Sequence, residues 1–281
     1  FYIGDAENRF RILYELEIDL GVFLNEDYPR RIISENLFVN GEPVFQRSGR
    51  LYLGNMKVIK GYLSGVTVQN PDSISEIAEN SLSQDELFLT NGFRLVVSPG
   101  FARLIADWFA DKFMIICRAD SMQLIKRFAD PKKKAVYIEK TTDQAAKLFG
   151  INSNAVGYVV SEEEPDAKLY SIFRDAQNRK SRAVAAEIFE SYGTIRFINM
   201  FPLVIKAIQT GGTLVVDEFD ASIHPMALMS IINVFHNDEV NIHHAQLIFN
   251  THNPIFLNSN LFRRDEIKFV ERDDDSHQSI L

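Results

Sequence analysis

Two short apolar runs that each end in polar residues constrain the fold of this chain most strongly. Thr213–Asp217 reads TLVVD and is followed directly by Glu218, and Gln246–Asn250 reads QLIFN and is followed by a threonine and a histidine. Between them, Pro225–Phe235 has the apolar spacing of a helix. Strand, helix and strand in this order are typical of an α/β layer with a parallel sheet, in which chemistry gathers at the carboxyl ends of the strands. The sequence therefore predicts a site built from the residues that follow these two runs.

The start of the chain has a different pattern. From Phe10 to Ile18 every second residue is apolar, which is typical of a half-buried strand. Asn40-Gly41 lies between two β-rich runs and predicts a tight hairpin. We therefore expect the first fifty residues to form antiparallel sheet.

The middle of the chain reads mostly as helices. The runs Phe101–Phe113 and Glu162–Lys180 are predicted to be helical, and AVYIE at residues 135–139 is a short β-like piece. A last strand is expected at Glu266–Glu271. These patterns predict an α/β protein with a β-rich lobe at residues 1–99, a helical insert at 100–189 and an α/β lobe at 190–281.

Composition limits the possible partners and compartment. The net charge is −8 and the only basic run is Lys132–Lys134, so no electrostatic footprint for nucleic acid or an anionic membrane is visible. The single cysteine, Cys117, allows no intrachain disulfide and favours a reducing cytoplasm. No apolar stretch approaches the ~20 residues of a membrane helix, so we expect a soluble, cytoplasmic protein without a membrane partner. Because the sequence begins without Met, we expect it to be a piece of a longer chain.

The adjacent carboxylates Asp217 and Glu218 close a strand that reads as buried. In that position one carboxylate can orient a magnesium-bound water, and the next can polarise an attacking water. Together these are the chemistry of phosphoryl transfer. The alternative is a strand that simply ends in a polar turn.

Two further elements are predicted to converge on the same place. His252 ends the neighbouring strand and, as a neutral donor, suits a phosphate oxygen; the alternative is an ordinary hydrogen-bonded loop histidine. Ser191 and Gly193 precede a helix, where a hydroxyl and backbone N–H groups favour an anion. Their alternative is an N-cap followed by a flexible glycine.

The order and spacing of four motifs resemble one family. ESYGT, TLVVDE, ASIH and FNTH follow one another as the signature loop, Walker B strand, D-loop and switch histidine do in the ABC-type ATPase heads of the SMC, RecF and OLD-like group. The segments DEFDASIHP, THNP and RRDEIKFVE resemble those of prokaryotic AAA-family ATP-binding proteins encoded in abortive-infection and other phage-defence operons, including the ATPase subunit of the PARIS system. The resemblance is strong from Glu190 to Glu271, fair from Phe10 to Arg47 and weak between them.

The resemblance implies an ABC-type P-loop NTPase head that binds ATP and Mg²⁺ and hydrolyses ATP at a dimer interface. It implies that Asp217 helps hold magnesium, Glu218 is the catalytic carboxylate and His252 senses the γ-phosphate. The implied contacts with the partner subunit's nucleotide come from the signature-like loop and the D-loop: Ser191, Gly193 and Thr194, and Ala221, Ser222 and His224. It further implies a homodimer or higher homo-oligomer of head-to-tail heads, an effector protein, and DNA or a phage protein as trigger in anti-phage defence.

One departure from the family is the phosphate loop. No glycine-rich loop ending in Gly-Lys-Ser or Gly-Lys-Thr occurs in these 281 residues, and in the family it lies ahead of the first strands, so we expect it before residue 1. Its absence keeps open a non-catalytic scaffold that retains the head fold. A metal-dependent hydrolase is the other alternative, because all histidines fall in the last third of the chain. They are His224, His236, His243, His244, His252 and His277.

Overall fold

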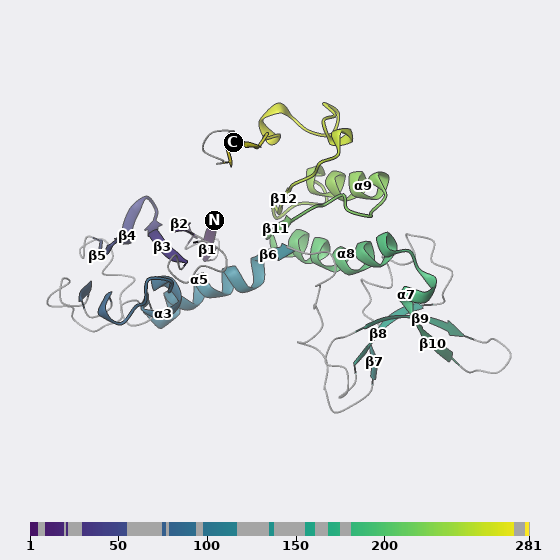
Figure 1. Cartoon of the computed structure of the whole chain (residues 1–281), viewed down its shortest axis with the longest axis horizontal. Helices are drawn as coiled ribbons and strands as arrows, with labels where there is room; N and C mark the ends of the chain where they lie inside the picture. Colours follow the sequence, from purple (N-terminus) through teal and green to yellow (C-terminus); the bar gives the residue numbers. More distant parts are fainter. Residues whose placement is uncertain are drawn as a thin grey trace. The chain divides into compact units, whose positions relative to one another are not determined.

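The computed structural model describes twelve stretches of the chain. They are residues 1–4, 9–19, 21, 30–54, 75–76, 79–93, 98–116, 135–137, 155–160, 168–174, 181–272 and 279–280. The chain divides into two compact units, Phe1–Ala110 and Asp111–Leu281 (Figure 1).

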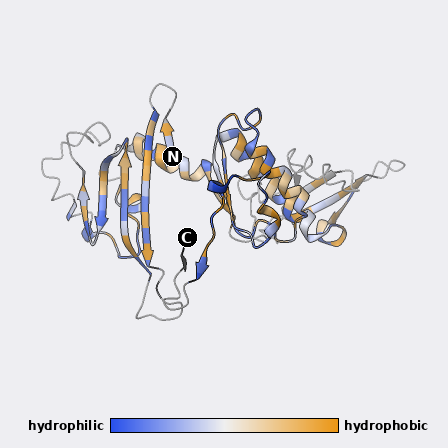
Figure 2. Ribbon diagram, turned by 90° about the horizontal axis from the view of Figure 1, so that it is seen from above, coloured by the Kyte–Doolittle hydropathy of each residue, from blue (hydrophilic) through white to orange (hydrophobic). Residues whose placement is uncertain are grey.

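The first unit contains an antiparallel sheet in the order β1-β2-β3-β4-β5. Its strands are β1 (Tyr2–Gly4), β2 (Arg9–Asp19), β3 (Arg31–Val39), β4 (Glu42–Ser48) and β5 (Arg50–Leu53). Polar and apolar residues alternate along these strands, as Figure 2 shows. The predicted hairpin is confirmed: Asn40 and Gly41 connect β3 to β4 with φ of 54° and 89°, the left-handed values that such a turn requires.

A buried carboxylate organises the packing of this unit. Glu35 on β3 is fully buried, and its oxygens accept hydrogen bonds from the backbone N–H groups of Phe88 (2.7 Å) and Leu89 (2.9 Å) in the short helix α3 (Phe88–Asn91). The hydroxyl of Tyr14 donates to it at 2.9 Å, and Arg47 lies 3.7 Å away. Aromatic rings from the sheet, from α3 and from α5 (Pro99–Lys112) fill the core around this network.

The second unit contains the predicted parallel sheet. β6 (Phe113–Ile116), β11 (Thr213–Val216) and β12 (Gln246–Phe249) pair in the order β12-β11-β6. The long helices α8 (Tyr192–Thr210) and α9 (Pro225–His236) run beside it (Figure 1). Both helices bury their apolar residues against the same face of the sheet. The residues of the opposite face include Ile115 and Ile248, which are more than half exposed.

A second antiparallel sheet precedes α8 and corrects the predicted helical insert. β7 (Ala135–Tyr137), β8 (Ala155–Val160), β9 (Lys168–Arg174) and β10 (Ser181–Ala185) form it in the order β10-β9-β8-β7, and the short helix α7 (Ala186–Phe189) follows. The prediction of a helix over Glu162–Lys180 was wrong where the structure describes it. Lys168–Arg174 is a strand that places apolar side chains on both faces of the sheet. It pairs with β10 on one side and with β8 on the other. The predicted helix over Phe101–Phe113 and the β-like piece at 135–139 correspond to α5 and β7.

The predicted lobe boundaries also differ from the structure. The two units divide within α5, between Ala110 and Asp111, and β6 lies inside the predicted insert although it pairs with β11. Of the helices in the described stretches, none is both long and apolar enough to cross a membrane.

The predicted strand over Glu266–Glu271 was also wrong. Arg264–Glu266 is the 3₁₀ turn η2, because the Glu266 carboxylate accepts the Arg263 N–H at 2.8 Å and closes the turn. Within the predicted range only Glu271 lies in a strand, β13 (Glu271–Arg272), which pairs with β14 (Ser279–Ile280). Another 3₁₀ turn, η1 (Pro254–Phe256), follows β12.

Candidate functional site

The ends of β11 and β12 bring the predicted site residues to one edge of the parallel sheet. The strands pair in register from Thr213↔Gln246 to Val216↔Phe249, so Asp217 and Asn250 follow them side by side. The Asn250 side chain bridges the two strand ends: its Nδ2 donates to Asp217 Oδ1 at 2.7 Å, and its Oδ1 accepts from the backbone N–H of Glu218. A single amide thus fixes both the carboxylate of Asp217 and the backbone of Glu218.

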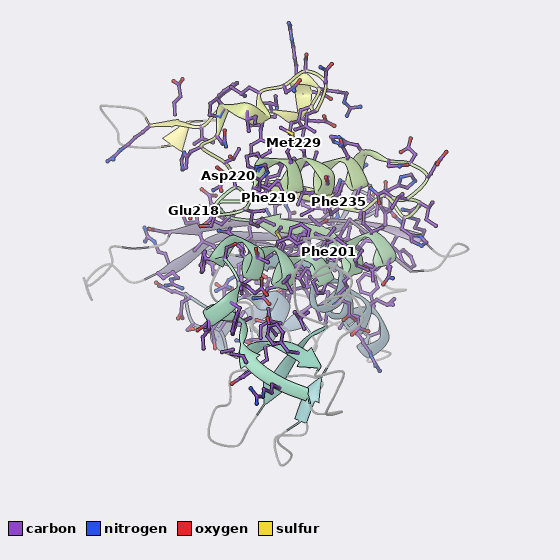
Figure 3. The ribbon with its side chains drawn as sticks, turned by 90° about the vertical axis from the view of Figure 1, so that its right-hand side faces the viewer. Phe201, Glu218, Phe219, Asp220, Met229 and Phe235 are labelled. Atoms are coloured by element: carbon purple, nitrogen blue, oxygen red, sulfur yellow. The ribbon has the colours of Figure 1, made fainter. Side chains whose placement is uncertain are left out.

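A tight turn after β11 presents the second carboxylate. The Ala221 N–H donates to the Glu218 carbonyl at 3.0 Å, and Glu218 has a φ of 49°, a left-handed value that costs a non-glycine residue on the order of 1 kcal/mol. Phe219 anchors the turn, because its buried ring packs against Phe249 at a centroid distance of 4.6 Å. Figure 3 shows Glu218, Phe219 and Asp220 at one end of the layer formed by the parallel sheet, α8 and α9. The Glu218 side chain is exposed, and among the described residues none donates a hydrogen bond to its carboxylate.

Arg196 is a site residue that the sequence interpretation missed. It is only 4% exposed, and its Nη2 donates to the carbonyl oxygens of Glu218 (2.6 Å) and Asp217 (3.3 Å). The guanidinium therefore holds the backbone of both acidic residues and places a fixed positive charge beneath them. The signal in the sequence is a single arginine in the buried stripe of α8, one turn after Gly193 and one turn before Met200.

The start of α8 places the predicted signature-like loop beside the same turn. Ser191 is the N-cap of α8: its Oγ accepts the Thr194 N–H at 3.1 Å and lies 2.8 Å from Thr194 Oγ1. A Cβ atom on Gly193 would overlap the carbonyl oxygen of Ser222, so only glycine permits this approach of the two backbones. The N-cap interpretation of Ser191 is thus confirmed, and Gly193 has a packing reason of its own.

The predicted D-loop residues connect the turn to α9. Ser222 is exposed and has a φ of 64°, another left-handed value, and Ala221 is half-buried. His224 is the N-cap of α9, because its Nδ1 accepts the Met226 N–H at 3.3 Å. The structure therefore brings Ser222 to the start of α8 and uses His224 to begin the next helix.

His252 lies in the loop after β12, exposed and two residues beyond Asn250. Its loop meets the Glu218 turn through Asn250, whose carbonyl also accepts the Phe219 N–H at 3.1 Å. Among the described residues, no hydrogen bond or ion pair engages the His252 ring. The ring therefore stands at the same sheet edge without a partner of its own from the described part of the chain.

The other histidines that the structure describes do not join Asp217 in a metal centre. His243 and His244 are exposed, His236 lies 3.8 Å from Glu266, and His277 is outside the described residues. In the parts of the chain that the structure describes, no three His, Cys, Asp or Glu side chains are grouped to hold a metal. The grouping that the hydrolase alternative needs is thus not found there.

The oxygen atoms at this edge suit magnesium and a phosphate ligand. Asp217 Oδ1 is oriented by Asn250 and the rest of its carboxylate is exposed, and a carboxylate with water and phosphate oxygens is the ligand set that Mg²⁺ prefers. Ser191 and the first N–H groups of α8 lie at the positive end of a long helix, which favours an anion. The residues present therefore fit a metal and nucleotide site.

The comparison with known protein families decides the class. A family described as "AAA domain, putative AbiEii toxin, Type IV TA system" matches residues 70–258, more than half of the chain. The chain belongs to this AAA-domain family. Membership implies the α/β fold of P-loop NTPases and the use of a nucleotide. The parallel sheet with α8 and α9 is consistent with that fold. The match includes all of the site residues described above. No curated protein and no solved structure matches the chain.

Proposed function

We propose that this AAA-domain chain is an ATP-binding and ATP-hydrolysing head of the ABC type, close to the SMC, RecF and OLD-like group. The observation that supports the proposal is the shared sheet edge: Asp217, Glu218 and the His252 loop are tied together by Asn250, and the start of α8 packs on the same turn. The phosphate-binding loop that hydrolysis requires is not among these 281 residues. Tests of activity therefore use the longest native chain that contains them.

In this proposal each residue has a separate task. Asp217 holds magnesium, which when bound neutralises charge on the phosphate oxygens. Glu218 accepts a hydrogen bond from the attacking water and orients it, and its free carboxylate and fixed backbone suit that role. His252 donates to the γ-phosphate, so its partner is present with ATP and lost with ADP. No covalent intermediate forms, because positioning and charge stabilisation provide the catalysis.

The assembly that we propose is a head-to-tail pair of copies of this chain. Ser191, Gly193 and Thr194 then contact the γ-phosphate of the partner's nucleotide, and Ala221, Ser222 and His224 line the contact between the heads. Closure of this pair would gate an effector protein in anti-phage defence, with DNA or a phage protein as trigger and no membrane component. The resemblance to defence-operon ATPases, including the PARIS subunit, supports this biological role.

Replacement of Glu218 by glutamine tests the proposal. Glu218→Gln keeps the shape of the side chain and removes the charge that orients water, so we expect ATP to bind normally and turnover to fall at least ~100-fold. The variant is expected to accumulate as an ATP-held dimer in sedimentation experiments. Glu239→Gln, an exposed glutamate in the turn after α9, is the matched control and keeps parental turnover. Normal turnover in Glu218→Gln would reject the catalytic role, and a parent protein that binds no ATP would favour the non-catalytic scaffold.

A further inference from the structure

The antiparallel sheet β7–β10 is attached to the loop that carries Ser191. Figure 1 shows this sheet and α7 at the start of α8. Val156 on β8 and Leu169 on β9 share a buried cluster with Ala186 on α7 and Ile198 on α8, and Ile195 packs against it. The sheet and the first turns of α8 are therefore one packed body.

A buried hydroxyl makes the most specific contact between them. Ser171 lies in the middle of β9 and is fully buried, and its Oγ donates to Glu190 Oε1 at 3.2 Å. Glu190 directly precedes Ser191 and ends α7, where its N–H donates to the Ala186 carbonyl at 2.8 Å. Phe173, two residues along the same face of β9, packs its ring on that of Phe189 at a centroid distance of 5.4 Å. The last residue of α7, Phe189, and its C-cap, Glu190, are thus both held by one face of β9.

The contacts continue from this loop to the acidic pair. Gly193 lies against the Ser222 backbone, and Arg196, one helical turn farther, holds the carbonyl oxygens of Asp217 and Glu218. A continuous series of contacts therefore links Glu190 to the turn that presents Glu218. Packed interiors contain few voids, so such a series of contacts can transmit a displacement.

We propose that Ser171 is a positioning residue for the Ser191–Gly193 loop. Its hydroxyl, fixed in the centre of the antiparallel sheet, orients Glu190 and so sets the direction in which the N-terminus of α8 faces its ligand. The sheet β7–β10 is then the element through which this loop is controlled. The structural part of this inference stands on the contacts alone, and its consequence for catalysis rests on the proposed function.

The test uses Ser171→Ala, which removes the hydroxyl without adding bulk. Without nucleotide, we expect backbone amides of residues 190–196 to exchange hydrogen at least ~3-fold faster than in the parent, because the Glu190 carboxylate loses the hydroxyl that donates to it. With a non-hydrolysable ATP analogue, head dimerisation should weaken about tenfold, as expected for one hydrogen bond to a charged group, while nucleotide affinity stays unchanged. Ser34→Ala is the matched control, because Ser34 makes the same type of bond to Glu17 (3.3 Å) on an exposed face of the other unit.

A double-mutant cycle with Glu190 separates positioning from general stability. Glu190→Gln keeps an oxygen acceptor and should stay close to the parent, whereas Glu190→Leu should reproduce the effect of Ser171→Ala, and the double variant should show no further loss. Additive losses, or unchanged exchange in residues 190–196, would overturn the proposal. If the parent does not dimerise with ATP, the proposed function fails, and the exchange experiment still decides whether Ser171 positions the loop.

Discussion

Two acidic sites in this protein are stabilised in opposite ways. In the first unit, Glu35 is fully buried and both of its carboxylate oxygens accept backbone N–H groups, with Tyr14 and Arg47 beside them. In the second unit, Glu218 is held by its backbone, through Arg196 and Asn250, and its carboxylate is exposed without a donor from the described residues. The comparison teaches that the first carboxylate is used for folding, whereas the second makes no hydrogen bond to the described residues and is the one to which we assign a ligand under the proposed function.

The Glu35 network also affects a neighbouring titration. Burial and the adjacent Glu35 carboxylate raise the pKa of Tyr14 well above its ordinary value. The neutral hydroxyl is therefore favoured in the folded state and donates to Glu35. This contribution to stability is complete below the ordinary tyrosine pKa of about 10 and is lost as the pH rises above it.

The largest effect is expected when the folding carboxylate is removed. Glu35→Ala leaves two backbone N–H groups and the Tyr14 hydroxyl without their acceptor and removes the ion-pair partner of Arg47. The free energy of unfolding should therefore fall by about 3–5 kcal/mol. Urea denaturation measures this loss. Glu17→Ala, which removes an exposed carboxylate of the same sheet, should change the free energy by less than about 0.5 kcal/mol. Similar losses of unfolding free energy in Glu35→Ala and Glu17→Ala would show that the buried carboxylate has no special role in folding.

Arg196→Met tests how the backbone of the acidic pair is held. Loss of the guanidinium leaves the Asp217 and Glu218 carbonyls without their buried donor, which should lower the free energy of unfolding by about 1.5–3 kcal/mol. Turnover should fall as well, since the turn loses one of the contacts that fix it. Arg263→Met, at an exposed arginine, is the control for charge removal. A variant with parental stability and turnover would show that Arg196 does not fix the turn.

A smaller effect is expected at the contact between α8 and the turn. In Gly193→Ala the new methyl group overlaps the Ser222 carbonyl, so the two segments must separate, at a cost of about 1–3 kcal/mol. Gly100→Ala has open space around its new methyl group and should be neutral or slightly stabilising. Thermal denaturation of the two variants distinguishes them. Equal melting temperatures would mean that the close approach at Gly193 carries no constraint.

The extent to which the sequence predicts this structure depends on how local each signal is. The β2 alternation, the Asn40-Gly41 turn and the TLVVD and QLIFN runs are local patterns, and the structure confirms the elements that they predict. β9 was missed because it depends on pairing with β8 and β10, which are separate segments, and its charged flanks resemble a helix. Arg196 and Asn250 gain their roles only when strand ends and a helix face meet in space. The roles assigned to Glu218, His252 and Ser191 remain predictions.

The central claim is that Glu218 is kept for a ligand at a cost to the fold. Glu218→Asn tests it most directly, because asparagine tolerates the left-handed backbone of this turn and carries no carboxylate. The free energy of unfolding and the ATP turnover are measured on the same sample of the longest native chain. We predict unchanged or higher stability, by up to about 1 kcal/mol, together with loss of turnover. A fall in stability of more than about 1 kcal/mol with turnover preserved would contradict the account.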